Sequence, residues 1–279
     1  MSTTTTPPET LSPRLADLKA DLVARVPVRN QATRDNLESK KLGEIINQYL
    51  AWQARLIRPR KREVVIWPEV AASPYYPSYA NEIADLEARF KSGDDLNPYL
   101  SNQVRTHAYA ASLPPPTTTL TTEEWVKRHW RGKDRMRVTV DAHHLHLGGM
   151  QADGKVARSD PLLFVAVTRE RAFFLTIGDH NSFDDGTVSS IMYDKLEAQL
   201  ASAGGGVAMG GPMVTLGGTQ VKDTMRSIQI VKALRAVDSE LAEQGHNGLA
   251  DRILRLEYDD ILIVDPSGDL EIRRLPGLL

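Results

Sequence analysis

The sequence predicts an α+β fold, with a mixed or antiparallel sheet, a helical N-terminal part and long flanking helices. Three observations predict it. Apolar residues recur at helical spacing near both ends of the chain. In the middle, short runs rich in β-branched and aromatic residues are typical of strands. Two of these runs are separated only by Arg169-Glu170-Arg171, which predicts an antiparallel hairpin.

The N-terminal half is expected to be mainly helical. Residues 1–10 are rich in threonine and proline, and we expect them to form a disordered tail. The helical region is then expected to span residues 11–113. Within it, the patterns predict helices at 11–25, 35–57 and 79–90, a strand at 63–67 and an irregular, proline-rich connection at 68–80.

The remainder, residues 121–279, is expected to form an α+β domain after a proline- and threonine-rich boundary at 114–120. Its expected elements are strands at 135–147, 162–168 and 172–178, helices at 125–130, 186–201 and 219–244, and a closing hairpin at 254–274. The turn of this last hairpin is predicted at residues 265–268, where Asp, Pro, Ser and Gly follow one another.

Composition and charge exclude several classes of protein. The 279 residues include 34 basic and 36 acidic side chains, so the chain is not basic overall, although a local basic patch remains possible. Cysteine is absent, which excludes disulfides, thiolate metal sites and a cysteine nucleophile. The sequence shows neither an apolar leader nor a run of roughly 20 apolar residues, so we expect a cytoplasmic protein without membrane contact.

Histidines cluster in the middle of the chain. His143, His144 and His146 lie in one predicted strand, and His180 ends another. Because side chains alternate along a strand, His144 and His146 should project to one face and His143 to the other. The apolar residues change parity near His143, which predicts a bulge or a sheet edge there.

Three interpretations of this cluster remain open. In the first, His144 and His146 bind a divalent metal with His180 as the third ligand, or with Asp179 or Asp141 as the third ligand. In the second, no cofactor is needed, because the histidines act as general acid and base. In the third, they are structural and bond only to neighbouring backbone.

The second interpretation also needs cations that hold a phosphodiester. The cations nearest to the cluster in sequence are candidates for this role: Arg135, Arg137, Lys155 and Arg158. A denser basic run contains Arg60 and Arg62, with Trp52 and Trp67 nearby as stacking surfaces. This run could equally be a solvated helix exit.

The order of elements over residues 123–183 resembles the core of the RelE-type ribonuclease toxins. The matching residues are the strand pair LLFVAVTRERAFFLTIGDH with its terminal His180, and Arg158 just before it. The resemblance implies metal-independent cleavage of RNA, with His180 as a catalytic residue and Arg158 against the scissile phosphate.

The leading hypothesis is therefore a ribonuclease-like effector that cleaves nucleic acid. In it, His144, His146, His180 and Arg158 are catalytic. The first alternative is a non-catalytic binding or regulatory protein, whose long helices at 35–57 and 219–244 contact a protein partner or a second copy. The second alternative is a metal-dependent hydrolase that uses the His-x-His pair.

Overall fold

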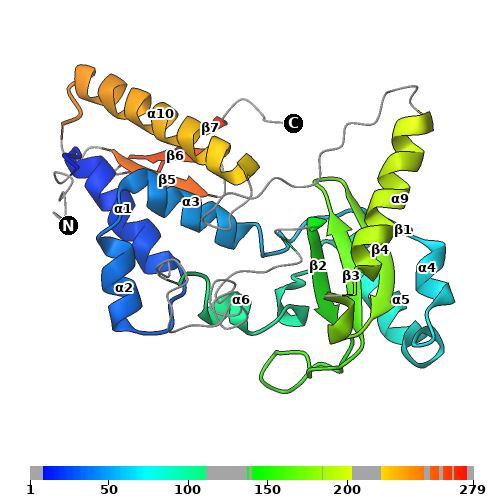
Figure 1. Cartoon of the computed structure of the whole chain (residues 1–279). Helices are drawn as coiled ribbons and strands as arrows, with labels where there is room; N and C mark the ends of the chain where they lie inside the picture. The colour runs from blue at the N-terminus through cyan, green and yellow to red at the C-terminus, as the bar shows by residue number, and fades with distance from the viewer. Residues whose placement is uncertain are drawn as a thin grey trace, which may run out of the picture. The chain divides into compact units, whose positions relative to one another are not determined.

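A computed structural model of the chain describes residues 9–110, 137, 140–183, 185–202, 221–247, 252–257, 260–265 and 267–274 (Figure 1). Helices and two sheets make up these parts, which confirms the α+β class. The chain divides into two compact units. We call them the terminal unit (Met1–Gln53, Ala108–Ala111 and Lys222–Leu279) and the histidine unit (Ala54–His107 and Ser112–Val221).

This grouping differs from the predicted split into residues 11–113 and 121–279. The closing strands belong with the N-terminal helices, because both bury their apolar side chains in one core. The predicted boundary at 114–120 and the predicted helix at 125–130 lie outside the described residues. Residues 1–8 of the predicted tail also lie outside the described residues, whereas Glu9 accepts hydrogen bonds from the Leu42 amide at 2.8 Å and from Arg235 at 3.0 Å.

The terminal unit combines four helices with an antiparallel sheet in the order β5-β6-β7. Its elements are α1 (Pro13–Arg25), α2 (Gln31–Glu38), α3 (Leu42–Gln53), α10 (Val221–Glu243), β5 (Ile253–Glu257), β6 (Asp260–Val264) and β7 (Leu270–Arg274). Three strands occupy the stretch predicted as a closing hairpin at 254–274, and the predicted hairpin is confirmed only for β6 and β7. Its turn is held by the Asp265 carboxylate, which accepts from the Ser267 and Asp269 amides.

The single helix predicted at 35–57 is wrong, because two helices occupy this stretch. Ser39 ends α2, and its hydroxyl donates to the carbonyl oxygen of Asn36. Glu44 then starts α3 by accepting from the Lys41 amide at 3.1 Å, as in a capping box. The apolar stripe runs across the break because both helices face the same core, so its periodicity did not reveal the break.

Helix α10 confirms the predicted helix at 219–244, except that Thr219 lies outside the described residues. Its apolar side is narrower than expected. Ile230 and Leu234 are fully buried, whereas Met225 and Ile228 are exposed. None of the described helices is long and apolar enough to cross a membrane.

The histidine unit contains a four-stranded mixed sheet in the order β1-β4-β3-β2. Strand β1 runs parallel to β4, and the other pairs are antiparallel. The elements are β1 (Glu63–Ile66), α4 (Pro68–Ala72), α5 (Tyr76–Ser92), η1 (Asn97–Tyr99), α6 (Gln103–Thr106), β2 (Ala142–His146), β3 (Leu162–Val167), β4 (Arg171–Gly178), η2 (His180–Phe183) and α9 (Thr187–Ser202). The predicted hairpin of β3 and β4 is confirmed.

Both faces of this sheet are covered by helices (Figure 1). On one face, Leu145 and Phe174 pack into a core with Phe90 of α5. On the other face, Leu162 and Phe164 pack with Val188 of α9. Helix α4 contributes Val70 to the α5 face, so the connection predicted to be irregular at 68–80 is in fact partly helical.

The strand predicted at 135–147 is shorter than expected. Arg137 and Val140 are helical, and β2 begins only at Ala142. Between them Asp141 has a φ of 60°, a left-handed conformation in which the chain changes from helix to strand. The change of apolar parity near His143 therefore marks a helix–strand junction, and the predicted bulge is not found there. The alternative prediction of a sheet edge is confirmed, since β2 is an end strand in the order β1-β4-β3-β2. The register shift in this sheet lies elsewhere, between Phe164 and Val165 of β3.

Candidate functional site

Strand β2 places two histidines on one face of the sheet. His144 pairs with Phe164 and His146 with Leu162, residues of the core beneath α9. The two imidazoles lie edge to face, with ring centroids 6.4 Å apart. His143 alternates with them and is buried. The predicted assignment of His144 and His146 to a common face is therefore confirmed.

His180 joins this pair because strands β2, β3 and β4 are adjacent. Leu162 pairs with both His146 and Gly178, and His180 follows Gly178 by two residues. The rings of His146 and His180 lie 6.5 Å apart at an interplanar angle of 41°. We refer to His144, His146 and His180 as the histidine cluster. The structure thus brings together the three histidines that the sequence singled out.

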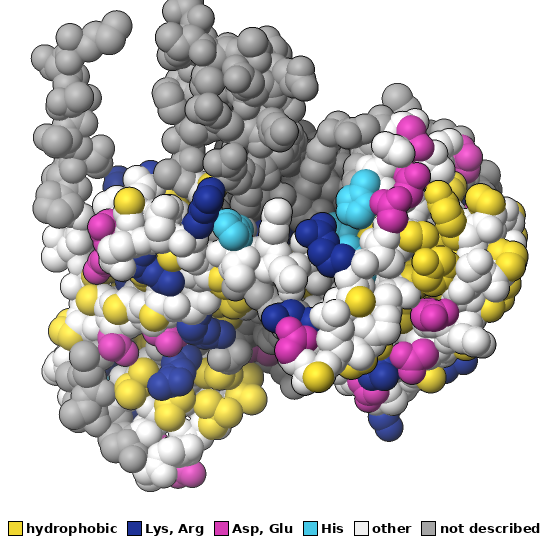
Figure 2. Space-filling model, turned by 90° about the horizontal axis from the view of Figure 1, so that it is seen from below, with side chains coloured by type: hydrophobic (Ala, Val, Ile, Leu, Met, Phe, Trp, Pro, Cys, Tyr) yellow, Lys and Arg dark blue, Asp and Glu magenta, His cyan; other side chains and the backbone are white. Residues whose placement is uncertain are grey.

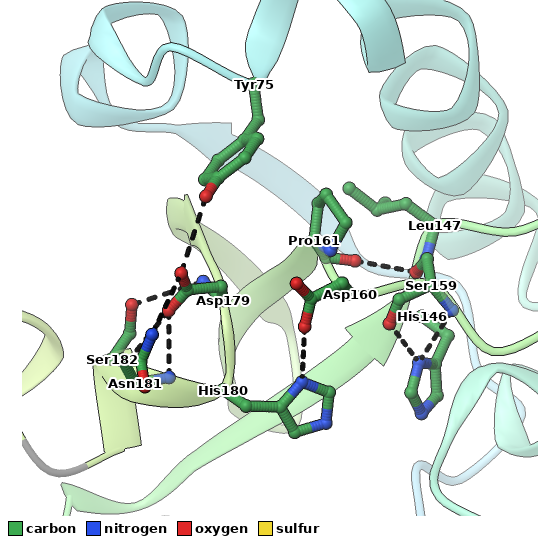
Figure 3. Close-up of polar contacts among 10 residues, drawn as sticks. All are labelled: Tyr75, His146, Leu147, Ser159, Asp160, Pro161, Asp179, His180, Asn181 and Ser182. Carbon is green, nitrogen blue, oxygen red and sulfur yellow. Dashed lines mark hydrogen bonds and ion pairs between the residues drawn. The ribbon is translucent and has the colours of Figure 1, made fainter.

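His146 is buried and uncharged at neutral pH. The residue is 3% exposed, and Nδ1 lies 3.2 Å from the Ser159 carbonyl oxygen and 3.4 Å from the Ser159 amide nitrogen (Figure 3). Burial lowers the pKa of His146 to about 4, although the bond to the Ser159 backbone raises it, and the charges of His144 and Arg158 lower it further. The imidazole is therefore neutral above about pH 5.

His180 is exposed and paired with a carboxylate. Its Nδ1 lies 3.0 Å from Oδ1 of Asp160, with exposed fractions of 48% and 80% for the two side chains (Figure 3). A carboxylate in this position keeps the proton of a neutral imidazole on Nδ1 and leaves Nε2 as an acceptor. This is the arrangement by which acidic residues orient catalytic histidines.

Asp160 and Ser159 were missed by the sequence reasoning. The available signal was their place directly before β3, the strand that runs between β2, which bears His144 and His146, and β4, which His180 follows. The Ser159 hydroxyl accepts from the Leu147 amide at 2.7 Å and donates to the Pro161 carbonyl at 2.6 Å. These bonds close the loop between β2 and β3, which holds His146 and Asp160 side by side.

The cations predicted to bind substrate have different surroundings. Arg158 is exposed and close enough to His146 to lower its pKa. Lys155 pairs with Asp153 at 2.6 Å within the same loop. Arg137 donates to the Ala54 carbonyl at 2.7 Å and pairs with Asp141. Arg135 lies outside the described residues.

Arg60 and Arg62 lie at the opposite end of the sheet from the histidine cluster. Their neighbour Glu63 pairs with Arg171, the first residue of β4, whereas His180 follows the last one. An eight-residue strand is about 25 Å long, so the structure does not bring this basic run to the histidines.

Arg62 is also buried. Its guanidinium donates to the backbone carbonyls of Arg58, Arg60 and Thr168. Burial is the main cause that lowers its pKa, followed by the charges of Arg60 and Arg58. These bonds fix the chain before β1, so the position of Arg62 favours a structural role over the predicted contact with phosphate.

Asp179 is engaged in the turn that carries His180. Its carboxylate accepts from the backbone amides of Asn181 at 2.8 Å and Ser182 at 3.3 Å, and from the Tyr75 hydroxyl at 3.4 Å (Figure 3). The amide of Asn181 is the main cause that lowers the pKa of Asp179. Among the described residues, no three His, Asp or Glu side chains are grouped so as to hold a metal ion.

The functional interpretation depends on this geometry, because comparison with known proteins does not indicate a function. No known family model, curated protein or solved structure matches the chain. Histidine side chains reach the surface of the histidine unit beside basic and acidic ones (Figure 2). The cluster thus offers an accessible imidazole oriented by a carboxylate, a neutral imidazole next to it and an arginine nearby, which is equipment for proton transfer at an anionic substrate.

Proposed function

We propose that this chain cleaves RNA without a metal ion, by general acid–base catalysis at the histidine cluster. The observation that carries the proposal is the pairing of His180 with Asp160 beside a second imidazole. The ring centroids of His180 and His146 are 6.5 Å apart, and burial keeps His146 neutral. RNA is the favoured substrate because its 2′-hydroxyl supplies the nucleophile, so the protein needs to provide only proton transfer and charge stabilisation. The resemblance to the RelE-type ribonucleases supports the same choice.

The proposed reaction is a transesterification. Nε2 of His180 accepts the proton of the 2′-hydroxyl, and the 2′-oxygen forms a bond to the adjacent phosphorus. The bond from phosphorus to the 5′-oxygen breaks, and that oxygen takes a proton from a second imidazole, for which His144 is the candidate. The products are a 2′,3′-cyclic phosphate and a 5′-hydroxyl end.

Arg158 and His146 assist without exchanging protons in this scheme. The exposed guanidinium of Arg158 is suited to the charge that develops on the phosphoryl oxygens. His146 remains neutral, so it can approach His180 and Arg158 closely without repelling either charge. Asp160 orients His180 and stabilises its protonated form after the first step.

The test is incubation of the purified full chain with a fluorescent single-stranded RNA, in EDTA, followed by analysis of the product ends. We expect 2′,3′-cyclic phosphate ends, and His180→Ala should lower the rate at least about 100-fold because the base is lost. His107→Ala is the matched control, since His107 lies in the same unit but interacts with Thr106. Cleavage that requires added metal, or RNA that stays intact under all conditions, would overturn the proposal.

A further inference from the structure

The connection between α4 and α5 is bonded to the end of β4, directly before His180. The buried Ser73 hydroxyl donates to the Ile177 carbonyl at 2.8 Å, and Tyr75 donates to Oδ2 of Asp179 at 3.4 Å. Figure 3 shows Tyr75 reaching from the turn directly before α5 toward Asp179, on the side of the turn away from the His180 ring. Two contacts therefore join residues 73–75 to the chain that leads into the cluster.

The turn that begins with His180 is built around the Asp179 carboxylate. This carboxylate accepts from the Asn181 and Ser182 amides, and the Ser182 hydroxyl accepts in return from the Asp179 amide at 3.2 Å. The turn also lies tightly against the strand: a Cβ on Gly178 would come within 2.4 Å of Oγ of Ser182. Few backbone conformations satisfy these contacts at once, so they fix the direction in which His180 leaves the strand.

From this arrangement we propose that Tyr75 and Asp179 are positioning residues for His180. Asp179 shapes the turn that presents the imidazole, and Tyr75 holds Asp179 in place. Neither side chain touches the imidazole through a bond that the structure records, whereas Asp160 does. The inference rests on the proposed function for its consequence in catalysis, but the positioning itself can be observed without any reaction.

The charges around Tyr75 keep its hydroxyl protonated, as a hydrogen-bond donor to Asp179 must be. The pKa of Tyr75 is raised, first by the charge of Asp179, then by burial and by the hydrogen bond itself, with a smaller contribution from Asp160. The phenol therefore remains protonated and able to donate to Asp179 over the whole range in which the protein would work. Asp160 and Asp179 face the phenol from two different segments, the loop before β3 and the end of β4.

The test combines NMR of the histidine rings with cleavage kinetics on the full chain. Asp179→Ala should shift the His180 ring resonances, because the imidazole would leave the strand in a different direction and move relative to Asp160. Tyr75→Phe should shift the same resonances in the same direction by a smaller amount, because it removes a single hydroxyl. Tyr76→Phe is the matched control, because Tyr76 is the neighbouring tyrosine and the first residue of α5, and it should leave these resonances unchanged.

In kinetics, Asp179→Ala should lower kcat by up to about 100-fold, the cost of displacing a reacting group by about 1 Å, with KM little changed. In a His180→Ala background the same substitution should have no further effect.

Asp179→Asn keeps an acceptor oxygen and should restore part of the NMR signature, which separates positioning from loss of folding. Unchanged His180 resonances in a folded Asp179→Ala protein would overturn the positioning inference even if RNA is cleaved. Shifted resonances in a protein that leaves RNA intact would support positioning and refute the proposed function.

Discussion

At the scale of single residues, His146 shows what the sequence could predict of the site. Its imidazole is buried against the sheet and lies beside His180 and the Ser159 backbone. Alternation along β2 predicted which face it would occupy, and the hairpin predicted that His180 would come near it. Its burial and its bonds to Ser159 could not be predicted, since they depend on a loop whose path is not periodic. Asp160 escaped notice for the same reason, because it bonds to a histidine 20 residues away.

The low pKa of His146 predicts a dependence of stability on pH. Its pKa is about 4 in the folded protein and about 6.5 when unfolded, so between these values the unfolded chain binds more protons. The stability that neutral His146 contributes is present above pH 6.5 and lost as the pH falls toward 4. His146→Asn removes the titration, so between pH 7.5 and 4.5 the wild type should lose about 2–3 kcal/mol more than the variant. Urea unfolding at both pH values measures this, and equal losses in the two proteins would contradict it.

At the scale of elements, the sequence predicted the type of each long segment better than its ends. The hairpin of β3 and β4 was recognisable because two apolar runs flank a short charged turn. The junction at Asp141 was not, because Met136, Val138 and Val140 alternate as they would in a strand. Only the packing of neighbouring elements decides between helix and strand for so short a run.

The loop between β2 and β3 makes a prediction at this scale. A Cβ on Gly148 would lie 2.1 Å from the carbonyl oxygen of Ala157, so Gly148→Ala must push apart the two sides of the loop that holds Ser159 and Asp160. We expect a destabilisation of about 1–3 kcal/mol, as for other overpacked sites, and a shift of the His146 ring resonances. Gly149→Ala is the matched control, because a Cβ there meets no atom within 4 Å. Thermal unfolding and NMR of both variants check this. Equal stability and equal His146 resonances in the two variants would contradict the prediction and show that the loop accommodates the added methyl group.

At the scale of the whole molecule, the ends of the chain share one core. Helix α1 contacts β5, although more than 200 residues separate them, and no pattern in the sequence predicts this association. Periodicity shows that a face is apolar but does not say which other face covers it. The predicted division of the chain followed composition along the sequence, whereas the structure follows the burial of these faces.

A buried ion pair between α1 and α10 tests this division. Arg14 is 3% exposed and bonds through Nε to Oδ1 of Asp238 at 2.8 Å. Asp238→Ala would leave the guanidinium buried without its counter-charge, which costs about 3–5 kcal/mol. Glu243→Ala, an exposed acidic position on the same helix, is the matched control.

Amide hydrogen exchange shows which elements the Asp238→Ala substitution destabilises. Because the pair lies wholly within the terminal unit, Asp238→Ala should reduce amide protection in α1, α3 and α10 while β3 and β4 keep theirs. The His146 ring resonances should also stay in place, since that residue belongs to the other unit. Equal loss of amide protection in both units would contradict this expectation, because it would mean that the two units unfold together. The loss of stability would then belong to the whole molecule instead of to the terminal unit.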